Sequence, residues 1–204
     1  MKINAAEFDQ IARTVFLPVY PVIADIILKK TGIMSGKCLD VGCGGGYLGI
    51  ALAAKTALDV CFLDESREML SIAERNIVDA GVGNRAETLV ADVHDIPLPD
   101  GSVDLVVSRG SLFFWEKQEK AFAEIHRVLR PGGAAFVGGG MGSARLKARV
   151  EAMMKERDCA GLNKAGRLTG KDACGAFAGF LETSAVSCFE MKKDDSGFWI
   201  YFRK

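Results

Sequence analysis

The sequence predicts an α/β fold in which a mostly parallel sheet carries helices on both faces. Two observations lead to this prediction. Residues 37–53 form a short apolar strand, a glycine-dense turn and a helix, which is how an open α/β sheet presents a crevice at the end of its first strand. After this unit, strand-like runs alternate with amphipathic helical segments, and such alternation favours parallel pairing.

Composition narrows the class of protein further. The chain has 204 residues, of which 49% are hydrophobic and 25% charged, so it can bury a substantial core. Its formal net charge is zero, and therefore no overall basic field favours nucleic acid. The six cysteines form no Cys-x-x-Cys pair, and we expect neither a metal site nor a disulfide scaffold. A reducing cytoplasm is the expected location.

Residues 1–36 are predicted to be a helical cap or lid segment ahead of a main domain over 37–204. Helical spacing breaks at two prolines, so we expect two short helices joined at Leu17–Pro21. The pair either packs on the sheet or covers the crevice with Tyr20 near the ligand. We expect no signal peptide, and the apolar run 15–28 is too short and too interrupted to span a bilayer.

The alternating region gives the predicted strands and helices in order. Strands are expected at 37–42, 58–64, 86–91, 103–108 and 134–139. Helices are expected near 46–55, 66–80 and 116–130, and Pro131-Gly132-Gly133 is expected to end the last of them.

The final third of the sequence continues with two helices and a hairpin. A charged helix is expected at about 143–158, and Thr169 with Asp172 resembles the capping box of another. Two closing strands are expected near 184–191 and 197–203, with a turn at Asp194–Gly197.

Three carboxylates follow three successive predicted strands. Asp40 directly precedes the glycines, where negative charge opposes a pyrophosphate and suits a cationic or hydrogen-bond-donating ligand. Asp64 lies about twenty residues further on, a position from which a carboxylate reaches the hydroxyls of a ribose. Asp92 can accept from an exocyclic amine while the Val93 N–H faces a ring nitrogen. Together they describe an adenosine with a positively charged amino-acid tail.

At this point the sequence resembles the class I S-adenosylmethionine-dependent methyltransferases, in their small-molecule, UbiE-like branch. The resemblance covers 37–140 and rests on the order and spacing of several motifs. These are the Asp40–Gly46 turn, Leu63-Asp64-Glu65-Ser66, Ala91-Asp92-Val93, 97–104 and Arg127-Val128-Leu129-Arg130-Pro131-Gly132-Gly133. It implies a Rossmann-like, seven-stranded sheet of order 3-2-1-4-5-7-6 with strand 7 antiparallel.

The resemblance also implies the cofactor, S-adenosyl-L-methionine, with S-adenosyl-L-homocysteine as product. Its contacts would be made by Asp40, Gly42, Cys43, Gly44, Gly46, Asp64, Glu65, Met69, Asp92, Val93, His94 and Ser108. Met69 packs on the adenine or belongs to the helix core. His94 is read as part of the adenine rim and not as a base.

The predicted reaction is an in-line displacement, in which the protein aligns the acceptor and excludes water. Substrate-facing candidates by position are Tyr20, Arg109, Phe113, Trp115 and Met141. Arg109 either attracts a carboxylate or phosphate of the substrate or pairs with a surface acid. The aromatic run 113–115 either walls an acceptor pocket or seats the next helix. No residue is assigned as catalytic, and the oligomeric state stays open.

Two other readings remain open. Gly44-Gly45-Gly46-Tyr47-Leu48-Gly49 satisfies Gly-x-Gly-x-x-Gly, so a nicotinamide-dependent oxidoreductase is one, although it leaves Asp40 and Asp92 unexplained. A non-catalytic module that binds the same cofactor is the other. A nucleic-acid acceptor is disfavoured, because no basic face or recognition domain is evident.

Overall fold

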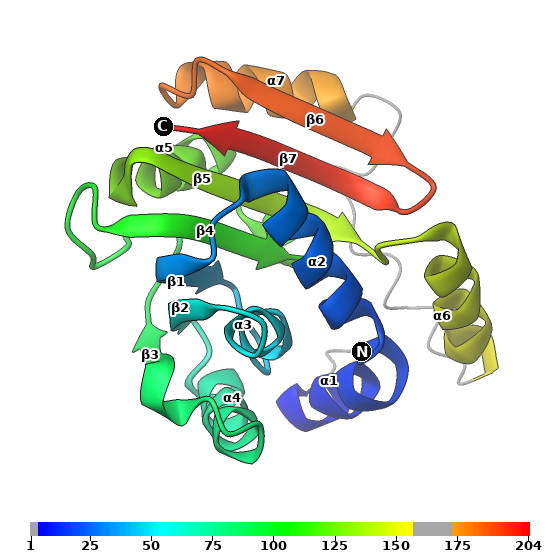
Figure 1. Cartoon of the computed structure of the whole chain (residues 1–204). Helices are drawn as coiled ribbons and strands as arrows, with labels where there is room; N and C mark the ends of the chain where they lie inside the picture. Colours follow the sequence, from blue (N-terminus) through cyan, green and yellow to red (C-terminus); the bar gives the residue numbers. More distant parts are fainter. Residues whose placement is uncertain (1–3, 157–172) are drawn as a thin grey trace.

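The computed structural model describes residues 4–156 and 173–204 and shows a central sheet with helices on either side (Figure 1). The strands are β1 (Ser35–Val41), β2 (Ala57–Asp64), β3 (Ala86–Val90), β4 (Val103–Arg109), β5 (Leu129–Gly140), β6 (Phe189–Asp194) and β7 (Gly197–Arg203). The α-helices are α1 (Ala5–Ile11), α2 (Val19–Thr31), α3 (Tyr47–Ala53), α4 (Arg67–Asp79), α5 (Gln118–Val128), α6 (Ala144–Glu156) and α7 (Ala173–Thr183). Short helical turns are η1 (Ala12–Phe16, a π-helix), η2 (Gly83–Arg85) and η3 (Ser111–Phe114).

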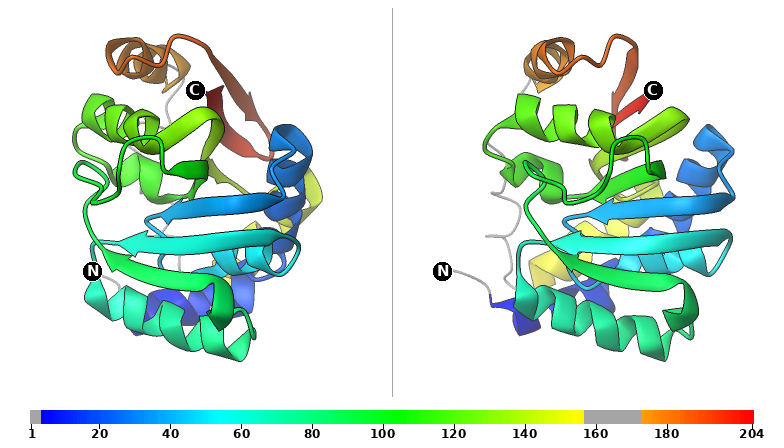
Figure 2. Two further views of the ribbon diagram at one scale, coloured as in Figure 1. Left: turned by 60° about the vertical axis from the view of Figure 1, so that its left-hand side comes forward. Right: turned by 90° about the vertical axis from the view of Figure 1, so that its left-hand side faces the viewer.

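The seven strands form one sheet in the order β3-β2-β1-β4-β5-β7-β6, as predicted. The pairs from β3 to β5 are parallel, whereas β7 is antiparallel to both of its neighbours. Figure 2 shows α4 and α7 at opposite ends of the molecule, beside the two outer strands. The parallel strands therefore all end at one edge of the sheet, which is where the carboxylates and the glycine turn are found.

Each face of the sheet has its own buried core, because successive strand residues point to opposite sides. On β4, Leu105 and Val107 belong to the core under α2, α3, α4 and α6, while Val106 belongs to the core under α5 and α7. This alternation confirms the predicted helices on both faces. It also places the turn after β1 between two rigid layers.

The amino-terminal helices follow the prediction with a shifted break. The helix α2 begins at Val19, so Pro21 lies in its first turn, where the missing N–H breaks no helical hydrogen bond. Its residues Val19, Ile23 and Ile27 are fully buried in the first core. Within the described residues, no single helix is long and apolar enough to cross a membrane. Taken together, α1–η1 and α2 have the length and apolar composition of a membrane span, but the two parts are bent by 75° relative to each other.

Two predicted boundaries are wrong for identifiable reasons. The helix expected over 116–130 ends at Val128, because Leu129 already pairs with Val103 and begins β5, so Pro131-Gly132-Gly133 lies inside that strand. The strand expected from 184 begins at Phe189, because Ala185 adopts a left-handed φ of 65° and the Val186 N–H caps α7 at Leu181.

The strand expected from 134 also begins five residues early, at Leu129, and the strand expected to end at 191 continues to Asp194. The other predicted bounds that can be compared lie within two residues of the structure, and the hairpin turn lies at 195–196 as expected. The predicted capping box of Thr169 and Asp172, and the end of the helix expected over 143–158, lie outside the described residues.

Phe122 is the centre of the second core and gives a test of it. Its ring makes edge contacts with Trp115, Phe177 and Phe202 at centroid distances of 6.0, 6.3 and 6.4 Å. We expect Phe122→Ala to lower the free energy of unfolding by about 3–5 kcal/mol, measured by urea denaturation. Phe114→Ala is the control, since that ring is 66% exposed. A Phe122→Ala protein as stable as the control would contradict this packing.

Candidate functional site

The turn after β1 has a backbone that favours glycine at three positions. Gly42, Gly44 and Gly46 have φ values of 63°, 54° and 79°, in the left-handed region. A Cβ atom at Gly42 would also lie 2.4 Å from the Cβ of Ser111. The turn therefore presents bare backbone to the space beyond the strand ends, and a ligand can approach it closely.

Asp64 holds this turn from the neighbouring strand. Its Oδ2 accepts the N–H of Gly44 at 2.8 Å, and its Oδ1 accepts the N–H of Ser66 at 2.9 Å. A carboxylate oxygen can accept more than one hydrogen bond, so both oxygens keep capacity for a further donor. Asp64 lies at the cavity described below, and its position suits a pair of hydroxyl groups.

Asp40 is a buried carboxylate at the end of β1. Its side chain Oδ2 accepts the N–H of Gly49, in the first turn of α3, at 2.9 Å, and the residue is 2% exposed. Burial, with the negative charge of Asp64 as a smaller cause, raises the pKa of Asp40 to about 7. The other oxygen has no hydrogen-bond partner among the described residues, so a cationic or donating ligand would compensate a charge that is otherwise costly.

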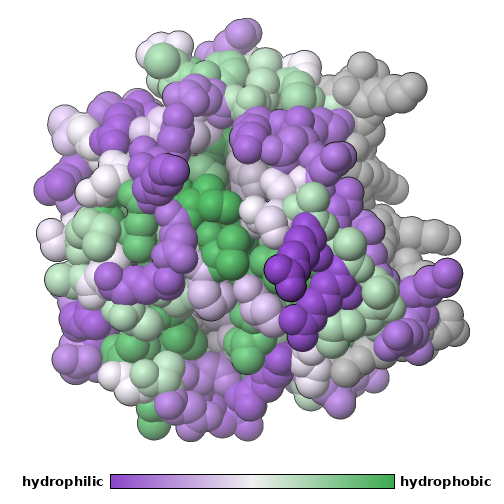
Figure 3. All heavy atoms as spheres, turned by 45° about the vertical axis from the view of Figure 1, so that its right-hand side comes forward, coloured by the Kyte–Doolittle hydropathy of each residue, from purple (hydrophilic) through white to green (hydrophobic). Residues whose placement is uncertain are grey.

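A cavity of about 1230 Å³ extends from the glycine turn to the β6–β7 hairpin. Its walls include Phe8, Phe16 and Tyr20 from the amino-terminal helices, and Met154 from α6. Figure 3 shows hydrophobic residues gathered near the centre of one face, with hydrophilic residues around them. The volume exceeds that of a typical single-ligand pocket, so two small molecules can be held together.

The structure brings ten of the predicted site residues to this cavity. They are Tyr20, Asp40, Gly42, Cys43, Gly44, Asp64, Met69, Arg109, Phe113 and Met141. Seven others lie outside its walls: Gly46, Glu65, Asp92, Val93, His94, Ser108 and Trp115. Of these, Gly46 is the buried N-cap of α3, and Glu65 is exposed to solvent.

The segment after β3 is held by its own contacts. The Asp92 carboxylate accepts the backbone N–H of His94 at 2.8 Å, and this hydrogen bond lowers the pKa of Asp92. The His94 Nε2 accepts the N–H of Lys117 at 3.2 Å, so the proton of the neutral ring is on Nδ1, which faces Asp92. Both ring nitrogens are thus occupied, and Val93 is buried in the second core.

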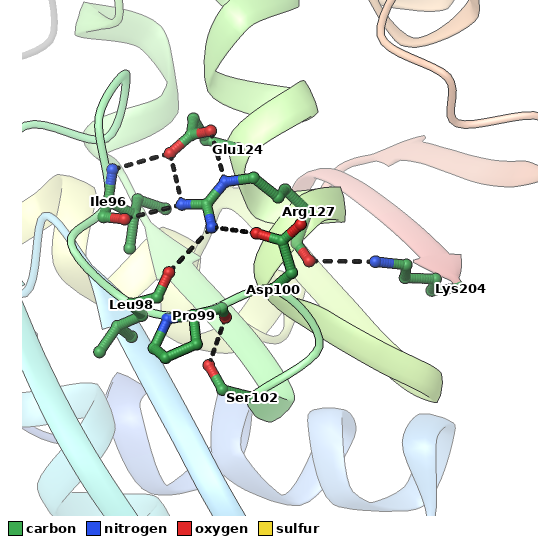
Figure 4. A network of polar contacts seen from close by, with 8 residues as sticks. All are labelled: Ile96, Leu98, Pro99, Asp100, Ser102, Glu124, Arg127 and Lys204. Carbon is green, nitrogen blue, oxygen red and sulfur yellow. Dashed lines mark hydrogen bonds and ion pairs between the residues drawn. The ribbon is translucent and has the colours of Figure 1, made fainter.

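Arg127 of α5 anchors the chain that follows this segment (Figure 4). Its guanidinium donates to the carbonyl oxygens of Ile96 and Leu98 at 2.7 and 2.8 Å, and pairs with Glu124 and Asp100. The Glu124 carboxylate in turn accepts the N–H of Ile96 at 2.9 Å. The connection from β3 to β4 is therefore fixed to a helix, which gives the segment at 91–94 a defined place beside Asp64.

Ser108 and Trp115 do not line the cavity. Ser108 is fully buried and lies 2.6 Å from the hydroxyl of Ser111, which itself donates to the Val41 carbonyl at 3.0 Å. Trp115 packs edge-on against Phe122 in the second core. Ser111 lines the cavity, and sequence reasoning did not assign it a role, because its place depends on contact with Gly42.

Sequence reasoning also missed a polar network that joins the amino-terminal helices to the turn. Tyr47 donates to Asp9 at 2.5 Å, and Asn76 donates to the Gly45 carbonyl at 2.8 Å. Arg13 contacts both the Tyr47 hydroxyl and the Asn76 side chain. The contacting pairs are separated by up to 63 positions, and no local pattern indicates that they meet.

The arrangement suits a nucleoside carrying a cation better than it suits a metal. No group of three His, Cys, Asp or Glu side chains in the described part of the chain is placed to hold a metal ion. Asp64 and Asp40 instead offer two acceptors next to bare backbone, one suited to hydroxyl groups and one to positive charge. This chemistry fits the cofactor that the sequence resemblance implied.

Comparison with known proteins gives a family match, a solved structure that covers the whole chain and relatives that share part of it. A family model described as "Methyltransferase domain" matches residues 39–137. A crystal structure assigned to an S-adenosyl-L-methionine-dependent methyltransferase of Methanococcus maripaludis is 38% identical. It covers 100% of this chain and 97% of that chain, with a TM-score of 0.91.

Two curated relatives share part of the sequence. The ubiquinone biosynthesis O-methyltransferase of Aeromonas salmonicida is 32% identical over 57% of this chain and 49% of its own length. The malonyl-[acyl-carrier protein] O-methyltransferase of Geobacter sulfurreducens is 34% identical over 76% of this chain and 59% of its own length. This chain therefore spans about half the length of the curated relatives that it matches.

The raised pKa of Asp40 makes the stability of the ligand-free protein depend on pH. Its folded pKa of about 7 exceeds the ordinary value of 3.8, so its contribution is fully present below pH 3.8 and is lost as the pH rises towards 7. We expect Asp40→Asn to be more stable than wild type by up to ~4 kcal/mol above pH 7, and less so at pH 5. Urea denaturation at both pH values checks this, and an equal difference at both would contradict it.

Proposed function

Because this chain belongs to the class I S-adenosylmethionine-dependent methyltransferases, we propose that it methylates a small-molecule acceptor held in the cavity beside the glycine turn. The observation that carries the proposal is the placement of Asp40 and Asp64 at the same cavity as the glycine turn, together with aromatic residues. Family membership also makes S-adenosylmethionine the methyl donor, which displaces the nicotinamide reading.

We assign the cofactor contacts as follows. Asp64 accepts the ribose hydroxyls while it continues to brace Gly44, and the glycine backbone lies against the methionyl part. Met69 and Phe8 lie beside Gly44 and form an apolar border to the same space. The adenine is assigned to the segment 92–94. This segment directly follows Ala91, whose N–H donates to the Asp64 carbonyl oxygen at 3.2 Å.

Asp40 has a separate role in this proposal. Its unpaired oxygen lies in a buried site, where attraction to a positive charge is much stronger than it is in water. When bound, S-adenosylmethionine supplies a methyl group on a positively charged sulfur, already activated for transfer. The carboxylate stabilises this charge, and its own ionisation becomes less costly in return.

The remaining walls of the cavity are proposed to bind the acceptor. Tyr20, Arg109, Phe113 and Met141 lie on its walls, and Phe8 and Phe16 cover it from the amino-terminal helices. These residues would align the acceptor and exclude water, which are the main contributions a protein makes to displacement at an activated centre. No general base is assigned. The location in the cytoplasm and the domain boundary at residue 36 stay predictions. The oligomeric state stays open.

Formation of S-adenosylhomocysteine tests the enzymatic part of the proposal. Incubation of the protein with S-adenosylmethionine and a pool of small metabolites is expected to release S-adenosylhomocysteine, measured by mass spectrometry. The same incubation without the pool is the control. Cofactor binding by calorimetry without any product from fractionated pools would favour the non-catalytic binding module instead.

Substitution of Asp64 tests the ribose contact. We expect Asp64→Ala to weaken S-adenosylhomocysteine binding about 100-fold or more, because two hydrogen bonds to a charged acceptor are lost. Asp59→Ala is the matched control, since Asp59 lies on the same strand, is exposed and does not line the cavity. Titration calorimetry gives the affinities, and thermal unfolding shows that each variant is folded. Unchanged affinity in a folded Asp64→Ala protein would refute the assignment.

A further inference from the structure

Arg109 is the last residue of β4, and its side chain is held in one orientation at the cavity wall. Its Nε donates to the carbonyl oxygen of Gly140 at 3.1 Å, and its Nη2 donates to the Sδ of Met141 at 3.4 Å. Both acceptors come from the end of β5 and the residue after it. One backbone oxygen and one side-chain sulfur at the end of β5 therefore position the guanidinium.

Two aromatic rings from the amino-terminal helices pack against the same group. The central carbon of the guanidinium lies 5.0 Å from the ring centroid of Phe16 and 5.0 Å from that of Tyr20. Tyr20 is itself stacked on Tyr47, with a centroid distance of 5.2 Å and an interplanar angle of 23°. Arg109 thus lies within an aromatic layer, in a setting where cation–π attraction replaces part of its hydration.

Arg109 has no carboxylate partner within 4.0 Å among the described residues. Arg13, Arg127 and Arg130, in contrast, each form an ion pair with an aspartate. Asp194, which also lines the cavity, pairs with Lys192 at 2.8 Å. A half-buried positive charge without a counter-ion is costly, so a functional reason for it is expected.

The guanidinium retains free donors on its outer side. Arginine carries five N–H groups, of which two are used by Gly140 and Met141. Tyr20 also receives a hydrogen bond from Arg109. At least two of the five N–H groups therefore remain, and a carboxylate can accept two parallel hydrogen bonds from such a pair. A lysine at this place would offer charge without this geometry.

The cavity that Arg109 borders also has aromatic walls. Phe113 and Phe198 form a tilted pair with a centroid distance of 6.4 Å, and both line the cavity. Gly139 lies against Phe113, and a Cβ atom there would come within 2.6 Å of the ring. A ligand bound to Arg109 would therefore lay an apolar or aromatic body along these rings.

We propose that Arg109 anchors the carboxylate of the methyl acceptor, and that the acceptor is a small carboxylic acid with an apolar body. The inference rests on the proposed function, because it concerns the acceptor half of the same cavity. Of the two partners expected for Arg109, an anionic group of the substrate and a surface acid, the proposal adopts the first. The carboxylate binds the guanidinium, and the aromatic rings select the rest of the molecule.

Matched acids and amides test this proposal in the protein saturated with S-adenosylhomocysteine. The probes are phenylacetate, cinnamate and hexanoate with their primary amides, followed by ligand-observed NMR. We expect at least one acid to bind about 10-fold or more tightly than its amide, because a charge-assisted pair is lost in the amide. Arg109→Gln is expected to remove this preference, and Arg109→Lys to retain only part of it.

Arg75→Gln is the matched control, since Arg75 is exposed on α4 and lies outside the cavity. It is expected to bind the probes as wild type does. The proposal is overturned if no acid is preferred to its amide in the wild-type protein, or if the preference persists in Arg109→Gln.

A further comparison identifies which carboxylate Arg109 serves. If Arg109→Gln weakens binding of S-adenosylhomocysteine but not of 5′-methylthioadenosine, which lacks the amino-acid part, then Arg109 holds the cofactor and the acceptor assignment is wrong. Equal affinity of wild type and variant for S-adenosylhomocysteine supports the acceptor role. Failure of the wild-type protein to bind S-adenosylhomocysteine at all would instead contradict the proposed function.

Discussion

The backbone of the turn between β1 and α3 is the constraint on which the site depends. Its left-handed glycines leave no side chain between the strand ends and the cavity, and a Cβ at Gly42 would collide with Ser111. Two carboxylates stabilise this conformation, because Asp64 accepts the Gly44 N–H and Asp40 accepts the Gly49 N–H. The residues that shape the turn are thus the same residues that offer oxygen atoms to a ligand.

Placing these carboxylates both to hold the turn and to face a ligand lowers the stability of the ligand-free protein, and packing elsewhere in the fold offsets this loss. Asp40 is buried beside a second carboxylate, and a buried charge that lacks full compensation destabilises the ligand-free protein. Two extensive apolar cores, one on each face of the sheet, supply the stability that makes this arrangement tolerable. A buried charge that is not fully compensated is the kind of local exception that is expected at a functional site.

The amino-terminal helices complete the site from outside the alternating region. The α2 helix is part of the first core, while Phe16 and Tyr20 reach Arg109 and Tyr47 connects to Asp9. The two readings offered for this segment are therefore compatible, because one face packs on the sheet and another borders the cavity. The polar contacts of Arg13 and Asn76 link the position of these helices to the glycine turn.

Local patterns in the sequence were sufficient to predict the order of strands and helices along the chain, the glycine turn and the carboxylates at the ends of β1 and β2. Hydrophobic periodicity, turn residues and motif spacing are all properties of neighbouring residues. The strand order came only with the family resemblance. Boundaries failed where pairing or capping decided them, as at Leu129 and Ala185. Only the tertiary structure decided that Ser108 and Trp115 stay outside the cavity walls, that Ser111 lines the cavity and that Arg109 has no acidic partner among the described residues. Those outcomes depend on contacts between distant segments, and the identity of a residue does not specify which segment will pack against it.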